Sequence, residues 1–493
     1  MQYRWQCSAV RWLFLCAVMF SLVGSAALLA QDNQSGSGNQ SGSGNQGGSG
    51  NQNDSRNQSG SSSAYSSNSE YNRGGVSIDA NGVLSRYTRT DVGQLSVRQL
   101  NVARSSYSLS SNLAVKSPLR CISLNRLEEM VKGSGIITDE MHYLAGVYRI
   151  TNIFYFPDSK DIVIAGPAEG WFPGHEGAMI GIESHQPICE LHHLVTALRA
   201  YAPGKDGPGI VGCSIDPTEE GNVHLQQFAT QFRGANRQAF IRGIQKSLGM
   251  QRISVDGIPA TTHAAQMMVA ADYRMKRIGL GMDPMRIQGG LQTFIANTVP
   301  NDANALFRWF FVPDYDCVVL TDDRTGMQLD GEGVKLVAEN EVVSRTGERT
   351  VVEGRLDPGS AAFTQSFTQQ YPKIAEKALI FAQLRNWIDM LVCAAHIQRE
   401  DFYGKSGWTM EFFGSEAKYP LETFVAPKEV EPVVGEARFR GMLLAPIGGG
   451  IVIEAELALD EERARVDVDG KIVNQQKRIA LNLPSGVWWW DAQ

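Results

Sequence analysis

Histidines gather in one short stretch of this chain, which has 493 residues and eight histidines. Residues 175 to 193 contain His175, His185, His192 and His193, accompanied by Glu176, Glu183, Cys189 and Glu190. Pro187 is well placed to begin a helix that runs to about Ala200, and on such a helix Cys189 and His193 stand one turn apart. A thiolate and an imidazole at this spacing can bind one Zn²⁺, with His175 or His185 from the preceding loop completing the site.

The same residues have a simpler interpretation as polar side chains at the edge of a helix. The chain contains no His-Glu-x-x-His and no paired Cys-x-x-Cys, the spacings that identify a zinc site with more specificity. We therefore expect no cofactor and keep zinc as the one candidate metal, with His175, His185, Cys189 and His193 as its candidate ligands.

Other catalytic patterns are weaker. Cys213 or Ser214 could act as a nucleophile with His224 as its base, but the segment lacks the second glycine of a Gly-x-Ser-x-Gly turn, and Cys213 is expected to face the core. Several acids near Pro-Asp turns could supply a carboxylate pair for glycoside hydrolysis, although such acids are normally turn residues. These acids are Asp158, Asp161, Asp314, Asp316, Asp322 and Asp323. Catalytic residues stay unassigned.

The elements that position these residues are expected to be mixed. The dipeptide Asn81-Gly82 between short apolar runs predicts a hairpin, and Asp256-Gly257 and Asp469-Gly470 repeat the signal. Ser123 can cap a helix that runs through Lys132, and Thr261 or Thr262 can open a helix that runs to Arg277 and ends at Gly279.

The longest predicted helix runs from Lys373 to about Ile397. Arg385 and Asp389 lie inside it at i, i+4, which argues against a membrane span and for a buried amphipathic helix. Two segments also resemble each other, residues 153–170 and 309–326, because both read as an aromatic strand, a Pro-Asp turn and an aliphatic strand. Two similar halves or a coincidence of hairpin chemistry would explain this likeness.

These patterns predict an α+β fold of hairpin-rich mixed sheets with packed amphipathic helices and a possible internal pseudo-repeat. We expect a main domain over residues 75–399 and a smaller β-rich C-terminal section over 400–493. The closing run Val487-Trp-Trp-Trp490 is expected to be a hydrophobic latch docked on the body, since a bare aromatic patch is usually covered.

The N-terminus predicts export. Arg4 and Arg11 precede an apolar run and small residues, the arrangement of a signal peptide over residues 1–30 with cleavage after Ala27 or Ala30. Residues 31–74 hold six-residue repeats such as NQSGSG, which have too little apolar surface to fold and predict a disordered linker. No transmembrane segment is expected after the signal peptide. The protein should be periplasmic, part of the cell envelope or extracellular.

The amino-acid composition argues against one class of partner. The chain has 45 basic and 52 acidic residues, a net charge of −7, which argues against general nucleic-acid binding. Five cysteines remain after the signal peptide, an odd and sparse set that predicts buried thiols more than a disulfide framework.

Several phrases together resemble a known family: Gly212-Cys-Ser-Ile-Asp-Pro-Thr-Glu-Glu-Gly221, Val269-Ala-Ala-Asp-Tyr-Arg-Met-Lys-Arg-Ile278, Leu384-Arg-Asn-Trp-Ile-Asp389 and Trp488-Trp-Trp-Asp491. The chain resembles the planctomycete family labelled domain of unknown function 1598 from about residue 90 to its end. The resemblance implies a secreted or cell-envelope setting in a planctomycete, and it brings no assigned activity or catalytic residue.

Two functions remain open. The first is a non-catalytic binding or structural protein whose partner is an unknown envelope or extracellular component. It is favoured by the export signal, the linker and the absence of a strict catalytic motif. The alternative is a secreted hydrolase, metal- or carboxylate-dependent. At least two of the histidines within ligand distance of Cys189 or Glu190 would favour the hydrolase.

Overall fold

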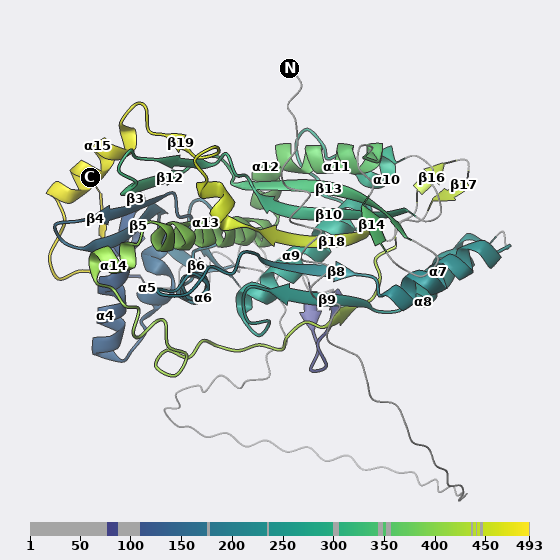
Figure 1. The fold of residues 1–493 in the computed structure, drawn as a ribbon, viewed down its shortest axis with the longest axis horizontal. Coiled ribbons are helices and arrows are strands. Elements are labelled where there is room, and N and C mark those ends of the chain that lie inside the picture. Colours follow the sequence, from purple (N-terminus) through teal and green to yellow (C-terminus); the bar gives the residue numbers. More distant parts are fainter. Residues whose placement is uncertain are drawn as a thin grey trace, which may run out of the picture. The chain divides into compact units, whose positions relative to one another are not determined.

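The computed structural model describes residues 76–86, 109–174, 178–233, 236–298, 305–343, 349–351, 356–434, 437–439, 441–443 and 447–492. The described residues lie in one compact unit. Two large sheets and the helices packed on them make up this unit, which confirms the expected α+β class (Figure 1). The predicted signal peptide and linker lie outside the described residues.

The larger sheet has nine strands within the described residues. In spatial order they are β1 (Val76–Ile78), β2 (Val83–Arg86), β15 (Glu429–Val430), β9 (Gln251–Asp256), β8 (Val211–Asp216), β18 (Ile447–Ile453), β10 (Ala305–Pro313), β13 (Val334–Val343) and β14 (Arg349–Val351). Strand β18 pairs antiparallel with β8 and parallel with β10. A strand from late in the sequence therefore joins the two sides of this sheet.

The second sheet has seven strands within the same described ranges. In spatial order they are β19 (Arg465–Val466), β11 (Val318–Leu320), β12 (Gly326–Leu329), β4 (Asn152–Phe156), β5 (Asp161–Ala168), β3 (Ser117–Ser123) and β20 (Trp489–Asp491). Two small ribbons pair β6 (Trp171–Pro173) with β7 (Met179–Gly181), and β16 (Ala437–Phe439) with β17 (Gly441–Leu443). The section expected from residue 400 onward thus supplies strands to both large sheets.

The closing aromatic run is docked, as predicted. Strand β20 pairs antiparallel with β3, and Trp488 and Trp490 are buried. The fully buried Arg120 donates from Nε to Asp491 Oδ1 at 2.8 Å and from Nη2 to Asp491 Oδ2 at 3.1 Å. The guanidinium also lies 4.7 Å from the ring centre of Trp489. The C-terminal strand therefore supplies the charged partner of a buried arginine.

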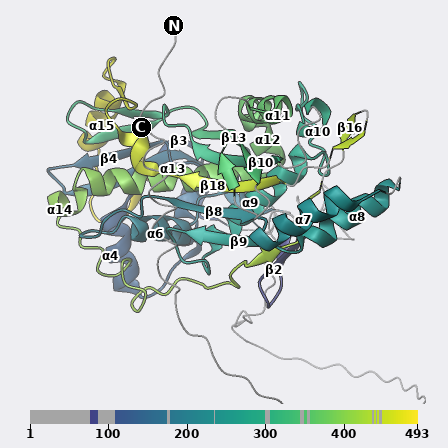
Figure 2. The same ribbon diagram turned by 45° about the vertical axis from the view of Figure 1, so that its right-hand side comes forward.

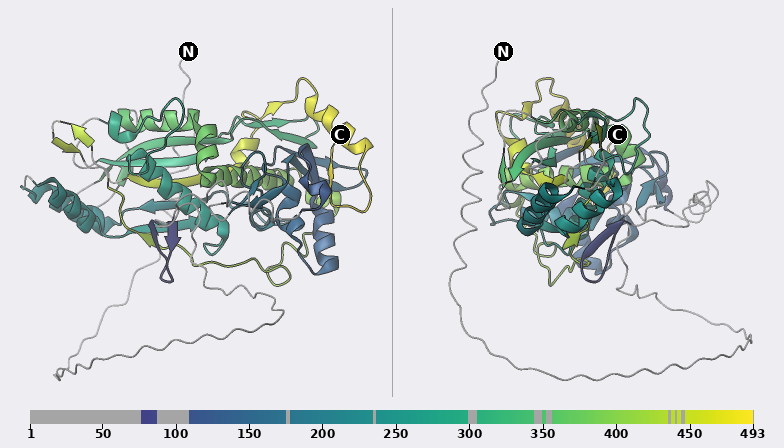
Figure 3. Two further views of the ribbon diagram at one scale, coloured as in Figure 1. Left: turned by 180° about the vertical axis from the view of Figure 1, so that it is seen from behind. Right: turned by 90° about the vertical axis from the view of Figure 1, so that its right-hand side faces the viewer.

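The helices pack on the sheets and on one another. They are α3 (Ser111–Ala114), α4 (Leu124–Ser134), α5 (Asp139–His142), α6 (Leu191–Ala200), α7 (Glu219–Gln231), α8 (Arg237–Leu248), α9 (His263–Gly279), α10 (Phe294–Asn297), α11 (Pro358–Gln369), α12 (Tyr371–Lys377), α13 (Leu379–Arg399), α14 (Phe402–Ser406) and α15 (Lys471–Leu481), with 3₁₀ turns η1 (Leu144–Gly146) and η2 (Ala455–Leu459). Helices α7 and α8 lie along each other beyond one end of β8 and β9, as the turned view in Figure 2 and the rear view in Figure 3 also show.

The predicted helix starts at Ser123 and Thr262 are confirmed. The Ser123 hydroxyl accepts from Arg126 N at the start of α4, and the Thr262 hydroxyl accepts from Ala265 N at the start of α9. Each hydroxyl satisfies a backbone N–H group that has no partner inside its helix.

The buried ammonium of Lys276 joins helix α9 to the middle of the nine-stranded sheet. Lys276 Nζ donates to Asp272 Oδ2 at 2.8 Å, to Ile215 O at 3.1 Å and to Gly449 O at 3.1 Å. Both charged side chains are buried. The ammonium therefore has three acceptors, one from its own helix and one each from β8 and β18.

The predicted long helix is broken. Helix α12 ends at Lys377, and α13 begins at Leu379 after a bend of 119°. Arg385 and Asp389, the two charged residues expected inside a buried helix, are both buried and bind partners from outside the helix. Arg385 binds Glu332 at 2.8 Å, and Asp389 binds Arg149 at 3.1 Å.

Helices α12 and α13 follow one another directly along the chain. No single helix among the described residues is long and apolar enough to cross a bilayer, whereas α12 and α13 taken together meet the criteria of length and composition as a bent pair.

Two hairpin predictions are wrong, and the pseudo-repeat is not supported. Strands β4 and β5 form the first expected hairpin, but β10 and β11 lie in different sheets. Strand β9 ends at Asp256 and is followed by α9, while Gly470 is the N-cap of α15. After each Asp-Gly dipeptide the chain therefore continues into a helix and does not return as a paired strand. The Asn81-Gly82 hairpin is confirmed, with β1 paired to β2.

Candidate metal centre

Two helix starts meet at one point of the interior. Glu190 is the N-cap of α6, and His192 and His193 follow in its first turn. His263 is the first residue of α9 and follows the Thr262 cap. Residues about seventy positions apart in the sequence are thereby brought side by side.

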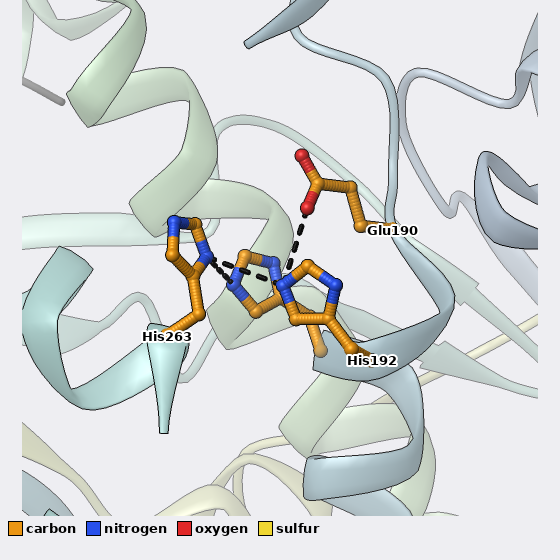
Figure 4. Close-up of side chains that lie close together, drawn as sticks. Glu190, His192 and His263 are labelled. Carbon is orange, nitrogen blue, oxygen red and sulfur yellow. Dashed lines mark hydrogen bonds and ion pairs between the residues drawn. The ribbon is translucent and has the colours of Figure 1, made fainter. Parts of the chain in front are cut away.

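Three imidazoles and one carboxylate converge there. One ligand atom from each of Glu190, His192, His193 and His263 lies within 4.8 Å of the other three. His263 Nδ1 is 2.7 Å from His193 Nε2 and 3.2 Å from His192 Nε2. Glu190 Oε2 is 3.2 Å from His192 Nε2. Figure 4 shows Glu190 and His263 pointing toward His192 from different elements.

These separations suit a small transition-metal ion. Zinc ligands at about 2.0–2.1 Å in a tetrahedron are about 3.3 Å from one another. The two contacts of His192, both 3.2 Å, match this spacing. The 2.7 Å contact between His193 and His263 is shorter, so these two rings must separate by about 0.6 Å to bind one ion.

Hydrogen bonding alone explains this convergence poorly. In a neutral imidazole one ring nitrogen carries a proton and the other carries a lone pair. His263 Nδ1 lies within hydrogen-bonding distance of two ring nitrogens, His192 Nε2 and His193 Nε2. A single ring nitrogen completes only one of these contacts as a good hydrogen bond, whereas one cation can be bound by all three nitrogens.

The carboxylate of Glu190 is oriented toward the imidazoles and not toward its own helix. An N-cap side chain usually accepts a hydrogen bond from the first turn, but Glu190 makes no such capping bond. Its side chain is 5% exposed and faces His192. A metal ion beside the imidazoles would give this buried carboxylate a charged partner in addition to His192.

Aromatic rings surround the cluster. The ring of Trp387 lies 6.1 Å from that of His193, and the ring of Phe424 lies 5.5 Å from that of His263. The backbone N–H of Phe424 donates to Thr261 O at 2.8 Å, just before α9. The chain segment that carries Phe424 is therefore held by a hydrogen bond at the start of the same helix as His263.

The structure brings one of the four predicted ligands, His193, into this cluster. His175 lies outside the described residues. His185 is exposed on the loop before α6. Cys189 is buried and is not one of the four clustered residues, and burial raises the pKa of its thiol. A thiol held in its protonated form is a poor metal ligand.

The difference arises because helix α6 begins later in the chain than the predicted start at Pro187. The helix begins at Leu191 because the preceding residues are bound elsewhere. Ile188 N donates to Met179 O, and Cys189 N donates to Val147 O. Cys189 therefore does not share a helix face with His193, whereas Glu190 and His192 take part in the cluster.

Sequence reasoning missed His263 as a candidate ligand. The only local signal was a histidine directly after the Thr262 cap, and many helices begin with such a residue without binding anything. The contact between α6 and α9 that brings it to His193 is a tertiary contact without a linear pattern.

The other candidate groups have structural surroundings. Cys213 is buried on β8, where burial raises the pKa of its thiol, and its candidate base His224 is exposed on α7. The Ser214 hydroxyl shares a hydrogen bond of 2.8 Å with Ser254. The five cysteines among the described residues are free and buried.

At least three of the six candidate carboxylates are engaged in turns and ion pairs. Asp161 binds the Ser123 hydroxyl and Arg126, Asp314 binds Lys335, and Asp323 accepts from Thr321 and Thr325. These contacts hold the acids in place as turn residues would be held.

Comparison with known proteins gives one match. No curated protein and no solved structure matches the chain. Residues 213–293 match the model of a family described as protein of unknown function (DUF1598). This segment runs from β8 to the residues after α9, and it contains His263 but not the residues of the α6 start. The resemblance to this family of unknown function is therefore confirmed over residues 213–293.

Proposed function

We propose that this protein is an exported metalloprotein that binds one transition-metal ion of the zinc class. The observation that supports this proposal is the convergence of Glu190, His192, His193 and His263 within 4.8 Å. Imidazole and carboxylate are ordinary zinc ligands, so the three imidazoles make a tetrahedral site with either this carboxylate or a water molecule in the fourth position.

The ligands are held by rigid elements. Both helix starts are fixed by hydrogen bonds to backbone N–H groups. His193 N and Leu194 N donate to Glu190 O at 3.1 and 3.2 Å, and Ala265 N donates to the Thr262 hydroxyl. Ligands positioned in advance lose little conformational freedom on binding, which favours tight binding.

Export is proposed on the sequence alone. The basic start, the apolar run and the small residues up to Ala30 support a signal peptide, and the repeats that follow support a flexible tether. The protein would then act in the periplasm, at the cell envelope or outside the cell. N-terminal sequencing of the mature protein would test this proposal, with Leu28 or Gln31 expected as the first residue.

The metal centre bears on the two functions left open by the sequence. In a non-catalytic binding or structural protein, a four-ligand metal site that is closed to solvent would stabilise the fold. A hydrolase needs a site that a water molecule can reach. His192 is 21% exposed, which favours the hydrolase as the second and more specific proposal.

Metal content tests the proposed site directly. The exported chain is purified without chelators or a histidine tag, and bound metal is measured by elemental mass spectrometry. We expect about one zinc ion per chain, reduced at least about tenfold in His193→Ala and His263→Ala, since each removes a ligand.

His185→Ala and His224→Ala are matched controls, because both histidines are exposed and lie outside the cluster. They should keep the wild-type metal content. A folded wild-type protein that stays metal-free after zinc addition and dialysis would refute the proposed site. Equal zinc in wild type and His263→Ala would also refute it.

A further inference from the structure

The candidate metal centre combines three buried residues with one that is partly exposed. Glu190, His193 and His263 are buried, whereas the side chain of His192 is 21% exposed. His192 is therefore the most exposed member of the cluster. A structural zinc site is usually closed to solvent, and a catalytic site keeps a position that solvent or substrate can take.

Aromatic side chains lie beside His192 and His263. The ring of His142 lies 5.7 Å from that of His192, and the ring of Tyr143 lies 4.7 Å from that of His142. His142 and Tyr143 are half-buried, as is Phe424 beside His263. These aromatic side chains offer apolar contact area with few charges beside the cluster, which suits an uncharged acyl group.

The four cluster residues can be assigned different roles. His263 Nδ1 contacts both other imidazoles, so the three rings share one centre. Glu190 Oε2 is 3.2 Å from His192, the most exposed ring of the cluster. A carboxylate beside the most exposed imidazole could accept a proton from a water molecule on an ion that the three imidazoles would hold.

We propose that the three imidazoles bind the ion, that Glu190 is the general base, and that the site hydrolyses uncharged carboxylic esters or amides. This inference rests on the proposed metal site. A water molecule on the ion gives a proton to Glu190, and its oxygen forms a bond with the carbonyl carbon. The bond from that carbon to the leaving oxygen or nitrogen breaks, and the leaving atom takes the proton from Glu190.

Glu190→Gln separates catalysis from metal binding. The glutamine keeps the size of the side chain and cannot take a proton. We expect the variant to retain about one zinc ion per chain and to hydrolyse p-nitrophenyl acetate with kcat lower by roughly 10²- to 10⁴-fold. His263→Ala should lose both zinc and activity, and His185→Ala should lose neither.

Glu190→Asp serves as the conservative variant. It keeps a carboxylate on a shorter side chain, so it should recover part of the activity lost in Glu190→Gln. Circular dichroism and thermal melting check that each variant is folded, and the comparison is made only between folded, zinc-loaded chains.

Each negative result of these experiments would contradict a different part of the proposal. Zinc loss in folded Glu190→Gln would make Glu190 a ligand and overturn its role as base. Zinc-loaded wild type no faster than Glu190→Gln toward p-nitrophenyl acetate and p-nitroacetanilide would overturn the hydrolysis and leave the metal site standing. Cleavage of bis(p-nitrophenyl) phosphate in place of these substrates would overturn the substrate class. Absence of zinc from the wild type would refute the metal site itself.

Discussion

His396 lies on α13 with no exposed surface, and its ring meets that of Phe402 edge-on at 5.2 Å. Burial lowers the pKa of this imidazole from its ordinary value near 6.5 to about 3. The folded protein therefore keeps His396 neutral in mildly acidic solution, whereas the unfolded chain takes up a proton there.

His396 should make the protein sensitive to acid. As pH falls from 6.5 toward 3, the unfolded state binds a proton at His396 that the folded state does not bind, so the free energy of unfolding falls. Between pH 7 and 4.5 the loss from this one group is about 3 kcal/mol. Urea unfolding at both pH values measures it, and His396→Leu should show a correspondingly smaller loss. His224→Leu, at an exposed position, should behave as the wild type; equal pH dependence in His396→Leu would contradict the assignment.

Single residues also show how far the sequence could predict the candidate site. Dense histidines and acids between His175 and His193 indicated the segment that supplies three of the four clustered residues. The individual members depended on where α6 begins, and the hydrogen bonds of Ile188 and Cys189 to distant backbone determine that start. His263 depended on a contact between helices, which no local spacing encodes.

At the scale of elements, strand β18 is shaped by its glycines. A Cβ atom at Gly450 would lie 1.9 Å from Cys213 O on β8, and one at Gly449 would lie 2.0 Å from Trp309 O on β10. Gly449 also has φ +108°, a conformation that side chains rarely allow. The strand can lie this close to both neighbours because it lacks side chains there.

Gly450→Ala should therefore be strongly destabilising. The added methyl group would press on backbone that is hydrogen-bonded within the sheet, and we expect a loss of roughly 3 kcal/mol or more, measured by urea unfolding. Gly133→Ala is the matched control, because Gly133 lies inside α4 with nothing within 4 Å of its added Cβ. That change should stabilise by about 0.5–1 kcal/mol through helix propensity. Similar effects of the two changes would contradict this account.

The prediction of one long helix from Lys373 to about Ile397 is wrong because of how the helices pack. Apolar periodicity runs through residues 371–399, so it cannot show that α12 and α13 meet at 119°. The break follows from packing. The Tyr371 hydroxyl donates to Phe381 O at 2.8 Å and draws the two helices together across the bend. Helix starts at Ser123 and Thr262 were predictable because a capping hydroxyl acts on its own first turn.

At the scale of the whole described unit, the C-terminus completes the seven-stranded sheet. Deleting residues 488–493 removes β20 and leaves Arg120 buried without Asp491. We expect the midpoint of urea unfolding to fall by an amount equivalent to at least roughly 3 kcal/mol, since an uncompensated buried charge is costly. Asp491→Asn, which keeps the strand, should lose less. A truncated chain that unfolds at the wild-type urea concentration would contradict the role of the latch.

The α+β class and the docked latch were predictable, whereas the sheet order was not. Strand β18 inserts between β8 and β10, which precede it by more than one hundred residues, and β11 leaves the sheet that contains β10. The apparent likeness of residues 153–170 and 309–326 reflects local turn chemistry that two different topologies share.

The place of β18 between β8 and β10 also sets the timing of folding. A ribosome delivers the chain from its N-terminus, so β8 and β10 emerge long before the strand that must join them, and β20 emerges last of all. The nine-stranded sheet lacks a central strand until residues 447–453 have emerged. Until then the facing edges of β8 and β10 stay without the strand that pairs with both, and such open edges must be kept from pairing with strands of other chains.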